Sequence, residues 1–202
     1  MQDGQNTIYE VLLGEVGLEE AIQAGVLSFL DLVPSTARLN GAEVELVAMM
    51  SRETRLRRAL ESVLPAYEYI VVDCPPSLGL LTVNTLTAAD SVLIPIQCEY
   101  YALEGLTQLS RTLDLVRQNL NPRLGIEGVL LTMFDRRLKL ANEVAEETRK
   151  FFGEKVYQTV IPRNVKLSES PSFGKPILYY DAQSTGAESY MSLAREVITH
   201  AS

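Results

Sequence analysis

Residues 69–84, with the sequence YIVVDCPPSLGLLTVN, decide the fold class of this chain. The segment begins with four apolar, mostly β-branched residues without polar alternation, which predicts a strand buried on both faces. This strand ends at Asp73, and open α/β sheets bind ligands at the carboxyl ends of their strands. Two prolines then predict a stiff loop, and Gly79 leads into an apolar helix. This order is typical of a metal-orienting carboxylate in a phosphate-handling enzyme; the simpler alternative is a buried strand whose aspartate caps the next turn.

The rest of the chain alternates between strand and helix patterns. From residue 80 onward, the predicted helices are 80–89, 103–120, 141–152 and 186–199, and the predicted strands are 91–96, 126–133 and 156–161. Before it, we expect a short helix capped by Thr7 and ended by Gly14, a helix at 18–24, a strand at 27–33, and a helix over 41–64 with a break near Ser51. The alternation predicts one α/β domain over residues 1–202, with a doubly wound, mostly parallel sheet between helices.

The composition is that of a folded protein without a membrane span. The chain is 47% hydrophobic and 22% charged, and it has neither an apolar run of spanning length nor a signal peptide, which predicts a cytoplasmic protein. A net charge of −8 argues against a general polyanion-binding surface but allows a local basic patch. Cys74 and Cys98 are too few for a metal cluster, and we expect both to be reduced and buried.

Three motifs together resemble the ParA/Soj family of chromosome- and plasmid-partitioning ATPases. They are DCPPSLG at 73–79, QCEYYALEGL at 97–106 and IPRNV at 161–165, in that order along the chain. The resemblance extends from about Thr7 to Val197. It implies a P-loop NTPase-like fold of the ParA/MinD type, ATP-dependent dimerisation, and non-specific DNA binding on the nucleoid with a ParB-like partner.

The resemblance also assigns roles to individual residues. It implies that Asp73 orients Mg²⁺ through water and that the loop after it senses the terminal phosphate of ATP, through Pro76, Ser77 and Gly79. It places the base and ribose of the nucleotide against two segments, Phe134 and Asp135 in one, and Pro162, Arg163, Asn164 and Val165 in the other. It matches DNA contacts to Arg137 and Lys166, a patch to which further cations could add: Arg136, Lys139, Arg163 and Lys175. Ordinary loop roles remain the alternative for the base and ribose residues, and Gln97, Glu99 and Tyr100 could line either the site or a dimer surface.

The sequence contains no glycine-rich phosphate loop. Its one Gly-Lys pair, Gly174-Lys175, is followed by Pro176 where a serine or threonine would have to hold the metal. By the resemblance, the phosphate loop and the first strand precede a segment like residues 7–14, so we expect an N-terminally incomplete ParA-like domain. The neighbouring strand at 69–72 would then keep an unpaired backbone. We expect the chain alone to bind ATP and Mg²⁺ weakly and to turn over no ATP.

Two functions remain open from the sequence. The first is the larger part of a dimeric partitioning ATPase, and the second is a non-hydrolysing ParA-like module that contacts DNA or a ParA or ParB partner. A MinD-like membrane-cycling ATPase is a weaker third alternative, because the last predicted helix lacks the basic amphipathic face that binds anionic lipid.

Overall fold

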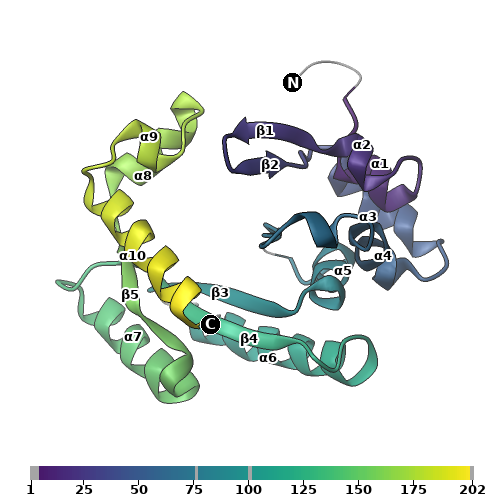
Figure 1. Ribbon diagram of the computed structural model, residues 1–202. Helices are drawn as coiled ribbons and strands as arrows, with labels where there is room; N and C mark the ends of the chain where they lie inside the picture. Colours follow the sequence, from purple (N-terminus) through teal and green to yellow (C-terminus); the bar gives the residue numbers. More distant parts are fainter. Residues whose placement is uncertain (1–4, 76, 100–101, 201–202) are drawn as a thin grey trace. The chain divides into compact units, whose positions relative to one another are not determined.

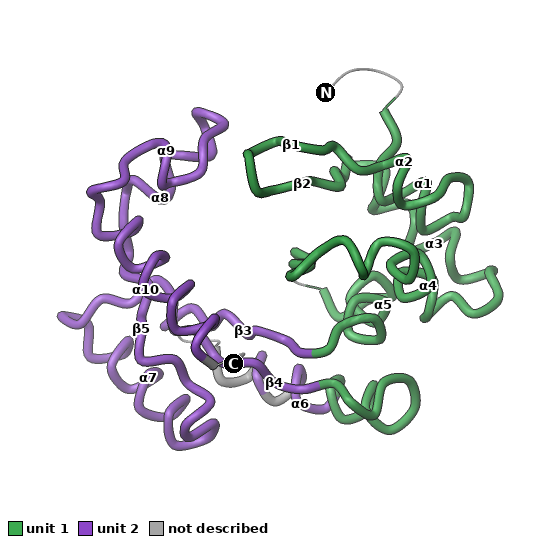
Figure 2. The backbone as a smooth tube through the Cα atoms, viewed as in Figure 1, with its two compact units in different colours: residues 1–90, 112–124 green, residues 91–111, 125–202 purple. Residues whose placement is uncertain are grey.

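The protein has a mixed α/β fold, which a computed structural model describes for residues 5–75, 77–99 and 102–200 (Figure 1). The chain forms two compact units: unit 1 contains residues 1–90 and 112–124, and unit 2 contains residues 91–111 and 125–202 (Figure 2). Each unit has a hydrophobic core of its own. A single domain over residues 1–202 stays a prediction. Among the described helices, none combines the length and apolar character needed to cross a lipid bilayer.

Unit 1 consists mainly of short helices with one β-hairpin. Its elements are α1 (Ile8–Leu13), α2 (Leu18–Ala21), β1 (Gln23–Leu27), β2 (Leu30–Leu32), α3 (Leu39–Val47), the 3₁₀ helix η1 (Arg52–Thr54), α4 (Arg55–Leu60), η2 (Leu64–Ala66) and α5 (Leu80–Ala88). The caps predicted for α1 are confirmed, since Thr7 accepts a hydrogen bond from the first turn and Gly14 ends the helix with a φ of 78°. The break near Ser51 is confirmed as well, because that residue adopts a φ of 53° between α3 and η1.

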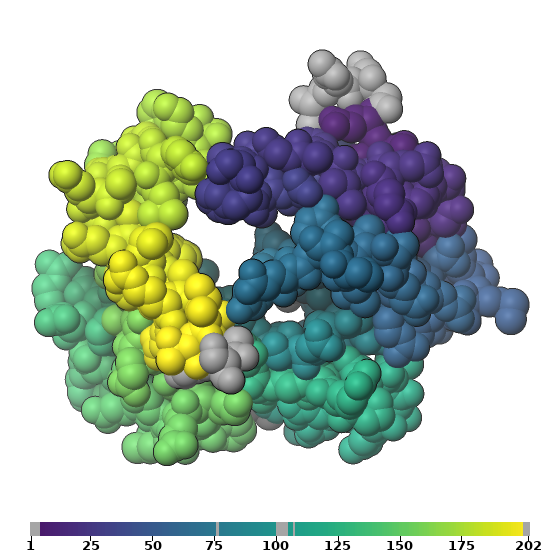
Figure 3. Space-filling model, in the orientation of Figure 1, coloured from purple at the N-terminus to yellow at the C-terminus, as the bar shows by residue number. Residues whose placement is uncertain are grey.

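An antiparallel hairpin replaces the single strand predicted at 27–33. β1 pairs with β2, and the Gly25 N–H donates to the carboxylate of Asp31 at 2.7 Å. Because β1 already begins at Gln23, α2 ends at Ala21 and is shorter than the predicted helix. The hairpin lies at the surface of unit 1, in dark indigo in Figure 3, with Phe29 exposed at its turn.

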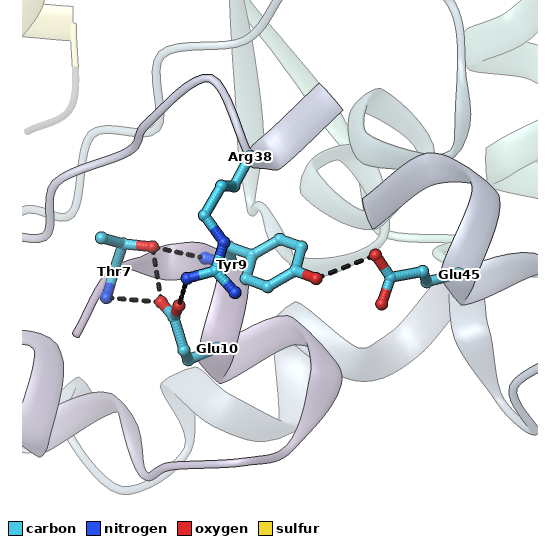
Figure 4. A network of polar contacts seen from close by, with 5 residues as sticks. All are labelled: Thr7, Tyr9, Glu10, Arg38 and Glu45. Carbon is cyan, nitrogen blue, oxygen red and sulfur yellow. Dashed lines mark hydrogen bonds and ion pairs between the residues drawn. The ribbon is translucent and has the colours of Figure 1, made fainter. Parts of the chain in front are cut away.

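A polar network fixes the start of α1 to α3 (Figure 4). The backbone N–H of Thr7 donates to Glu10 Oε2 at 2.9 Å, and the Thr7 side chain accepts from the Glu10 backbone, which together form a capping box. The Thr7 hydroxyl also donates to Glu10 Oε2, at 2.7 Å. The other carboxylate oxygen of Glu10 lies 2.6 Å from Arg38 Nη1. The guanidinium of Arg38 lies 4.3 Å from the centre of the Tyr9 ring, and the Tyr9 hydroxyl donates to Glu45 at 2.8 Å. These contacts hold two helices together that are separated by the hairpin in the sequence.

Unit 2 contains a three-stranded parallel sheet in the order β3-β4-β5. Its elements are β3 (Ser91–Gln97), α6 (Ala102–Asn119), β4 (Gly125–Phe134), α7 (Lys139–Phe152), η3 (Gly153–Lys155), β5 (Val156–Pro162), α8 (Val165–Glu169), η4 (Ser170–Phe173), α9 (Ile177–Tyr180) and α10 (Thr185–His200). Only the part of α6 up to residue 111 belongs to unit 2, and the rest of this helix belongs to unit 1. The three strands and the helices α6, α7 and α10 confirm the sequence predictions to within a few residues. α10 packs against the sheet through Leu193, which joins Leu130, Tyr157 and Ile161 in one buried cluster.

The segment 69–72 is where the structure departs most from the sequence prediction. It forms no strand, and it makes no backbone ladder with any other described part of the chain. Val71 is 91% exposed, so the prediction of a strand buried on both faces is wrong, and Asp73 does not follow a sheet strand. The physical reason is that an extended apolar segment becomes a strand only when a second backbone satisfies its N–H and C=O groups. Cys74 is likewise exposed, contrary to prediction, whereas Cys98 is buried as predicted.

Candidate functional site

In unit 1, the candidate residues lie in the loop that precedes α5. Asp73 and Ser77 are exposed, and Gly79 forms the N-cap of the helix. Pro76 lies outside the described residues. The hydroxyl of Thr82 donates to the Ser77 carbonyl at 2.6 Å, which closes the end of the loop onto the first turn of α5. The predicted sequence of loop, glycine and helix is therefore present.

Glu43 is a residue of this region that the sequence analysis missed. Its side chain comes from α3 and lies against Gly79, where a Cβ atom would come within 2.0 Å of Glu43 Oε1. The same oxygen is buried, and it has no hydrogen-bond partner among the described residues. Glycine at position 79 thus leaves room for this carboxylate beside the N-terminus of α5. Nothing in the local sequence indicates the contact, because the two residues are far apart along the chain.

Asn84 holds α5 in place. Its side chain is buried, accepts a hydrogen bond from Leu56 N–H at 3.2 Å, and donates to the carbonyls of Arg52 at 2.7 Å and Leu80 at 3.0 Å. The contacts with Leu56 and Arg52 reach the neighbouring segments α4 and η1, whereas the contact with Leu80 lies within α5. The loop at 73–79 therefore precedes a helix with a fixed position within unit 1.

The donor set around Asp73 does not by itself form a metal site. In the part of the chain that the structure describes, no three His, Cys, Asp or Glu side chains gather closely enough to hold a metal ion. Mg²⁺ depends on several oxygen ligands and, in many enzymes, on substrate phosphates. Asp73 remains a predicted outer ligand that would act through water.

In unit 2, the candidate residues meet at the carboxyl edge of the parallel sheet. Phe134 at the end of β4 is the register partner of Pro162 at the end of β5, and the N–H of Arg163 donates to the Phe134 carbonyl at 3.2 Å. The Arg163 guanidinium then lies 3.0 Å from Glu99, which follows β3. The fold therefore brings together the strand-end residues that the sequence analysis named on three separate segments.

Asn164 has a structural role at the start of α8. Its side-chain oxygen accepts hydrogen bonds from the N–H groups of Lys166 at 2.8 Å and Leu167 at 3.3 Å, and its amide donates to Thr185 at 2.7 Å. Val165, the first residue of α8, is exposed. The chain itself thus uses both ends of the side-chain amide, and a contact of Asn164 with the nucleotide stays a prediction.

Arg137 is exposed and is held by Asp135. The side chain of Arg137 is 85% exposed, and two of its nitrogens contact the two carboxylate oxygens of Asp135 at 2.7 and 2.9 Å. Hydrogen bonds from the side chain and then the backbone of Arg137 lower the pKa of Asp135 to about 2. The carboxylate is therefore ionised at neutral pH, and it neutralises the cation nearest to it.

Lys166 is held by two side chains that the sequence analysis did not single out. Its ammonium lies 3.0 Å from Glu169 Oε2, an oxygen that also accepts a hydrogen bond from the Tyr180 hydroxyl at 2.9 Å. The ammonium lies 5.7 Å from the centre of the Tyr180 ring. Only the three-residue spacing of Lys166 and Glu169 on a helix could have indicated this pair in advance.

Gln97 and Glu99 line an open groove of about 320 Å³ between β3 and the first turns of α6. The groove also contains the apolar side chains of Ile94, Leu106 and Leu109. Tyr100 lies outside the described residues. A role for Gln97 and Glu99 in either a ligand site or a dimer surface stays open.

Comparisons with known proteins agree with these observations. A protein family described as "AAA domain" matches residues 1–126. The chain is 57% identical over 195 residues to the sporulation initiation inhibitor protein Soj of Bacillus subtilis, covering 96% of this chain and 77% of that protein. It is 58% identical over 192 residues to the chromosome partitioning protein ParA of Myxococcus xanthus, covering 95% of this chain and 68% of that protein.

A solved structure supports the same α/β architecture. The crystal structure of cobyrinic acid a,c-diamide synthase from Mycobacterium smegmatis, with a bound ATP analog and magnesium, matches with a TM-score of 0.80 and 33% sequence identity. The match covers 96% of this chain and 72% of that one. The predicted α/β fold class is thereby confirmed.

Proposed function

Because the chain belongs to the ParA/Soj family of chromosome-partitioning ATPases, we propose that it contacts DNA without sequence specificity through unit 2, by means of Arg137 and Lys166. The observation that carries the proposal is that these two exposed cations follow adjacent strands of one parallel sheet. Both are long basic side chains that can contact phosphate oxygens. The chain carries a net charge of −8, so such binding depends on a local patch, to which Arg136, Lys139, Arg163 and Lys175 add charge.

The residues that the sequence analysis matched to the nucleotide keep those roles as proposals. We assign Asp73 to Mg²⁺ through water, and Ser77 and Gly79, with Pro76, to the terminal phosphate. The base and ribose would meet Phe134, Asp135, Pro162, Arg163, Asn164 and Val165. In ATPases of this kind, the terminal phosphoryl group of Mg²⁺-bound ATP is transferred to water, and catalysis comes from neutralising charge and positioning the reactants.

Binding of ATP and Mg²⁺ by the chain alone is proposed to be weak. The sequence has no glycine-rich loop to cradle phosphates, and Asp73 is a single exposed carboxylate. We therefore propose no ATP turnover above background. Hydrolysis that is present in the chain and disappears in Asp73→Ala would show this proposal to be wrong.

The proposed partners follow from the family. We propose that the chain acts in the cytoplasm, associated with the nucleoid, with a ParB-like protein and a second copy of itself. The relatives of Bacillus subtilis and Myxococcus xanthus bear names that refer to sporulation control and chromosome partitioning. A non-hydrolysing module that contacts DNA or a ParA or ParB partner is the second candidate.

DNA binding provides the direct test. We would measure the affinity of the 202-residue chain for a fluorescent duplex of arbitrary sequence at several salt concentrations. Arg137→Ala and Lys166→Ala should each weaken binding, and each should reduce the slope of log K against log salt by up to about one. Lys150→Ala is the matched control, because Lys150 is an exposed, ion-paired cation on α7 outside the proposed patch.

Equal binding by the chain, Arg137→Ala and Lys166→Ala would refute the proposed DNA surface. A loss with Lys150→Ala as large as the loss with Arg137→Ala would also refute it, because the attraction would then come from charge in general.

A further inference from the structure

Asp135 and Arg137 form a two-point ion pair directly after β4. Arg137 Nη2 lies 2.7 Å from Asp135 Oδ2, and Arg137 Nε lies 2.9 Å from Asp135 Oδ1. The backbone N–H of Arg137 also donates to Oδ1, at 3.0 Å. Two parallel N–H···O bonds to two oxygens of an anion are the geometry by which arginine binds phosphate. The Asp135 carboxylate therefore already occupies the N–H groups of Arg137 that would donate to a DNA phosphate.

The two partners differ in how far solvent reaches them. The side chain of Arg137 is 85% exposed, whereas that of Asp135 is only 17% exposed. An approaching polyanion would meet the guanidinium first and would find the carboxylate behind it. The nearby Arg163 also favours the ionised form of Asp135.

Neighbouring cations lack this arrangement. Arg136 is exposed and forms no ion pair with any described residue. Lys139 has a single contact of 3.3 Å with Glu143, and the side chain of Lys139 is 91% exposed. Single contacts between exposed charges contribute little free energy, whereas a two-point arginine pair is the stronger kind.

We propose that Asp135 competes with DNA phosphate for Arg137 within the chain and thereby sets the strength of non-specific DNA binding. The inference rests on the proposed DNA contact of Arg137. A phosphate can form the two-point pair with Arg137 only when it displaces Asp135, and the ionised carboxylate repels that phosphate at the same time. Because Arg137 is exposed, the effect is a several-fold change in affinity.

Asp135→Asn tests the competition, because asparagine keeps the size of the side chain and one acceptor oxygen but removes the charge. With the 202-residue chain and the same fluorescent duplex, Asp135→Asn should bind about 3- to 10-fold more tightly at low salt. The slope of log K against log salt should become steeper by up to about one. In the double variant Asp135→Asn with Arg137→Ala, the gain should disappear.

Glu147→Gln is the matched control. It makes the same change in net charge within unit 2, but Glu147 lies on α7 and pairs with Lys150. Thermal unfolding of each variant, followed by circular dichroism, shows whether the folded populations are equal. The inference predicts that Asp135→Asn strengthens binding clearly more than Glu147→Gln does.

The outcomes separate the inference from the proposed function. If Arg137→Ala weakens binding and Asp135→Asn strengthens it no more than Glu147→Gln does, the inference is overturned and the DNA surface stands. If the gain of Asp135→Asn persists without Arg137, the effect is a general one of charge, and the inference is overturned as well. If Arg137→Ala binds as the unchanged chain does, the inference fails, and the DNA surface fails with it when Lys166→Ala also binds as the unchanged chain does.

Discussion

Two segments with similar strand-like sequences have different structures in this protein. Residues 69–72 read YIVV, and β3 (Ser91–Gln97) reads SVLIPIQ; a loop and a helix follow each of them. β3 pairs in parallel with β4 and buries Ile94 and Ile96, whereas Val71 in the first segment is 91% exposed. The comparison teaches that an apolar, β-branched sequence allows a strand to form and that a neighbouring backbone is needed to complete it.

The largest expected effect is a difference in stability between two isoleucine-to-alanine substitutions, one in each segment. Ile96→Ala should lower the free energy of unfolding by about 2–5 kcal/mol, because it leaves a cavity in a packed sheet. Ile70 is 39% exposed against 4% for Ile96, so Ile70→Ala should cost less than about 1 kcal/mol. Urea unfolding followed by circular dichroism measures both. An equally large loss for Ile70→Ala would mean that another surface covers residues 69–72 in solution.

Two glycines extend the comparison to backbone packing. A Cβ atom at Gly128 in β4 would lie 2.4 Å from the ring of Tyr157, and only 1% of Tyr157 is exposed, so the ring has little room to move. Gly128→Ala should therefore destabilise the protein by about 1–3 kcal/mol. Gly79→Ala should cost less, because it meets the flexible end of Glu43. Thermal unfolding of the two variants checks this order, and a larger loss for Gly79→Ala would contradict it.

The capping network of unit 1 should make stability depend on pH. Hydrogen bonding from Thr7, together with the charge of Arg38, lowers the pKa of Glu10 below its ordinary value of 4.5. The resulting stabilisation is complete above that value and is lost as the pH falls through the lower pKa of the folded state. Glu10→Gln should cost about 1 kcal/mol at neutral pH, and its melting temperature should fall less than that of the unchanged chain between pH 5 and about pH 3.

Melting curves at several pH values provide this measurement. Glu147→Gln serves as the control, because Glu147 is an exposed carboxylate with only a surface ion pair. A parallel fall of melting temperature with pH in Glu10→Gln and the unchanged chain would exclude Glu10 as the cause.

The two cysteines distinguish the same two segments without any effect on stability. Cys74 follows residues 69–73 and is exposed, whereas Cys98 follows β3 and is buried. Burial raises the pKa of the Cys98 thiol to about 11, and local desolvation of its thiol raises the pKa of Cys74 as well, although the residue as a whole is exposed. Because the thiolate is the reactive form, iodoacetamide should label Cys74 at least about tenfold faster than Cys98 at pH 8. Mass spectrometry of the labelled peptides measures the ratio, and equal rates would contradict the structure.

Local signals in the sequence predicted much of the fold. Thr7 and Gly14 mark the ends of α1 because their cap interactions involve only nearby residues. The strands of unit 2 and the long helices between them follow from hydrophobic patterns of the same local kind. The hairpin of β1 and β2 and the short helices α8 and α9 were missed, because each depends on contacts outside the pattern itself. At residues 69–72 the apolar pattern wrongly predicted a buried strand, whereas the expectation of an unpaired backbone there is confirmed within the described part of the chain.

The candidate site shows the same division. The sequence indicated that Phe134, Asp135 and Arg163 follow neighbouring strands, and the parallel sheet confirms that they meet at one edge. It did not indicate that Glu43 lies against Gly79, since helices that are distant in the sequence bring those residues together. Nor did it indicate that Asp135 forms a two-point ion pair with the guanidinium of Arg137.

The sequence by itself determined the family of this protein, the order of most of its helices and strands, and the residues placed at the strand ends. The tertiary structure alone decided which apolar segment became a strand and which basic side chains were already paired. The physical reason is that caps and periodicity act over a few residues, whereas a backbone ladder or an ion pair depends on where the rest of the fold places its second partner.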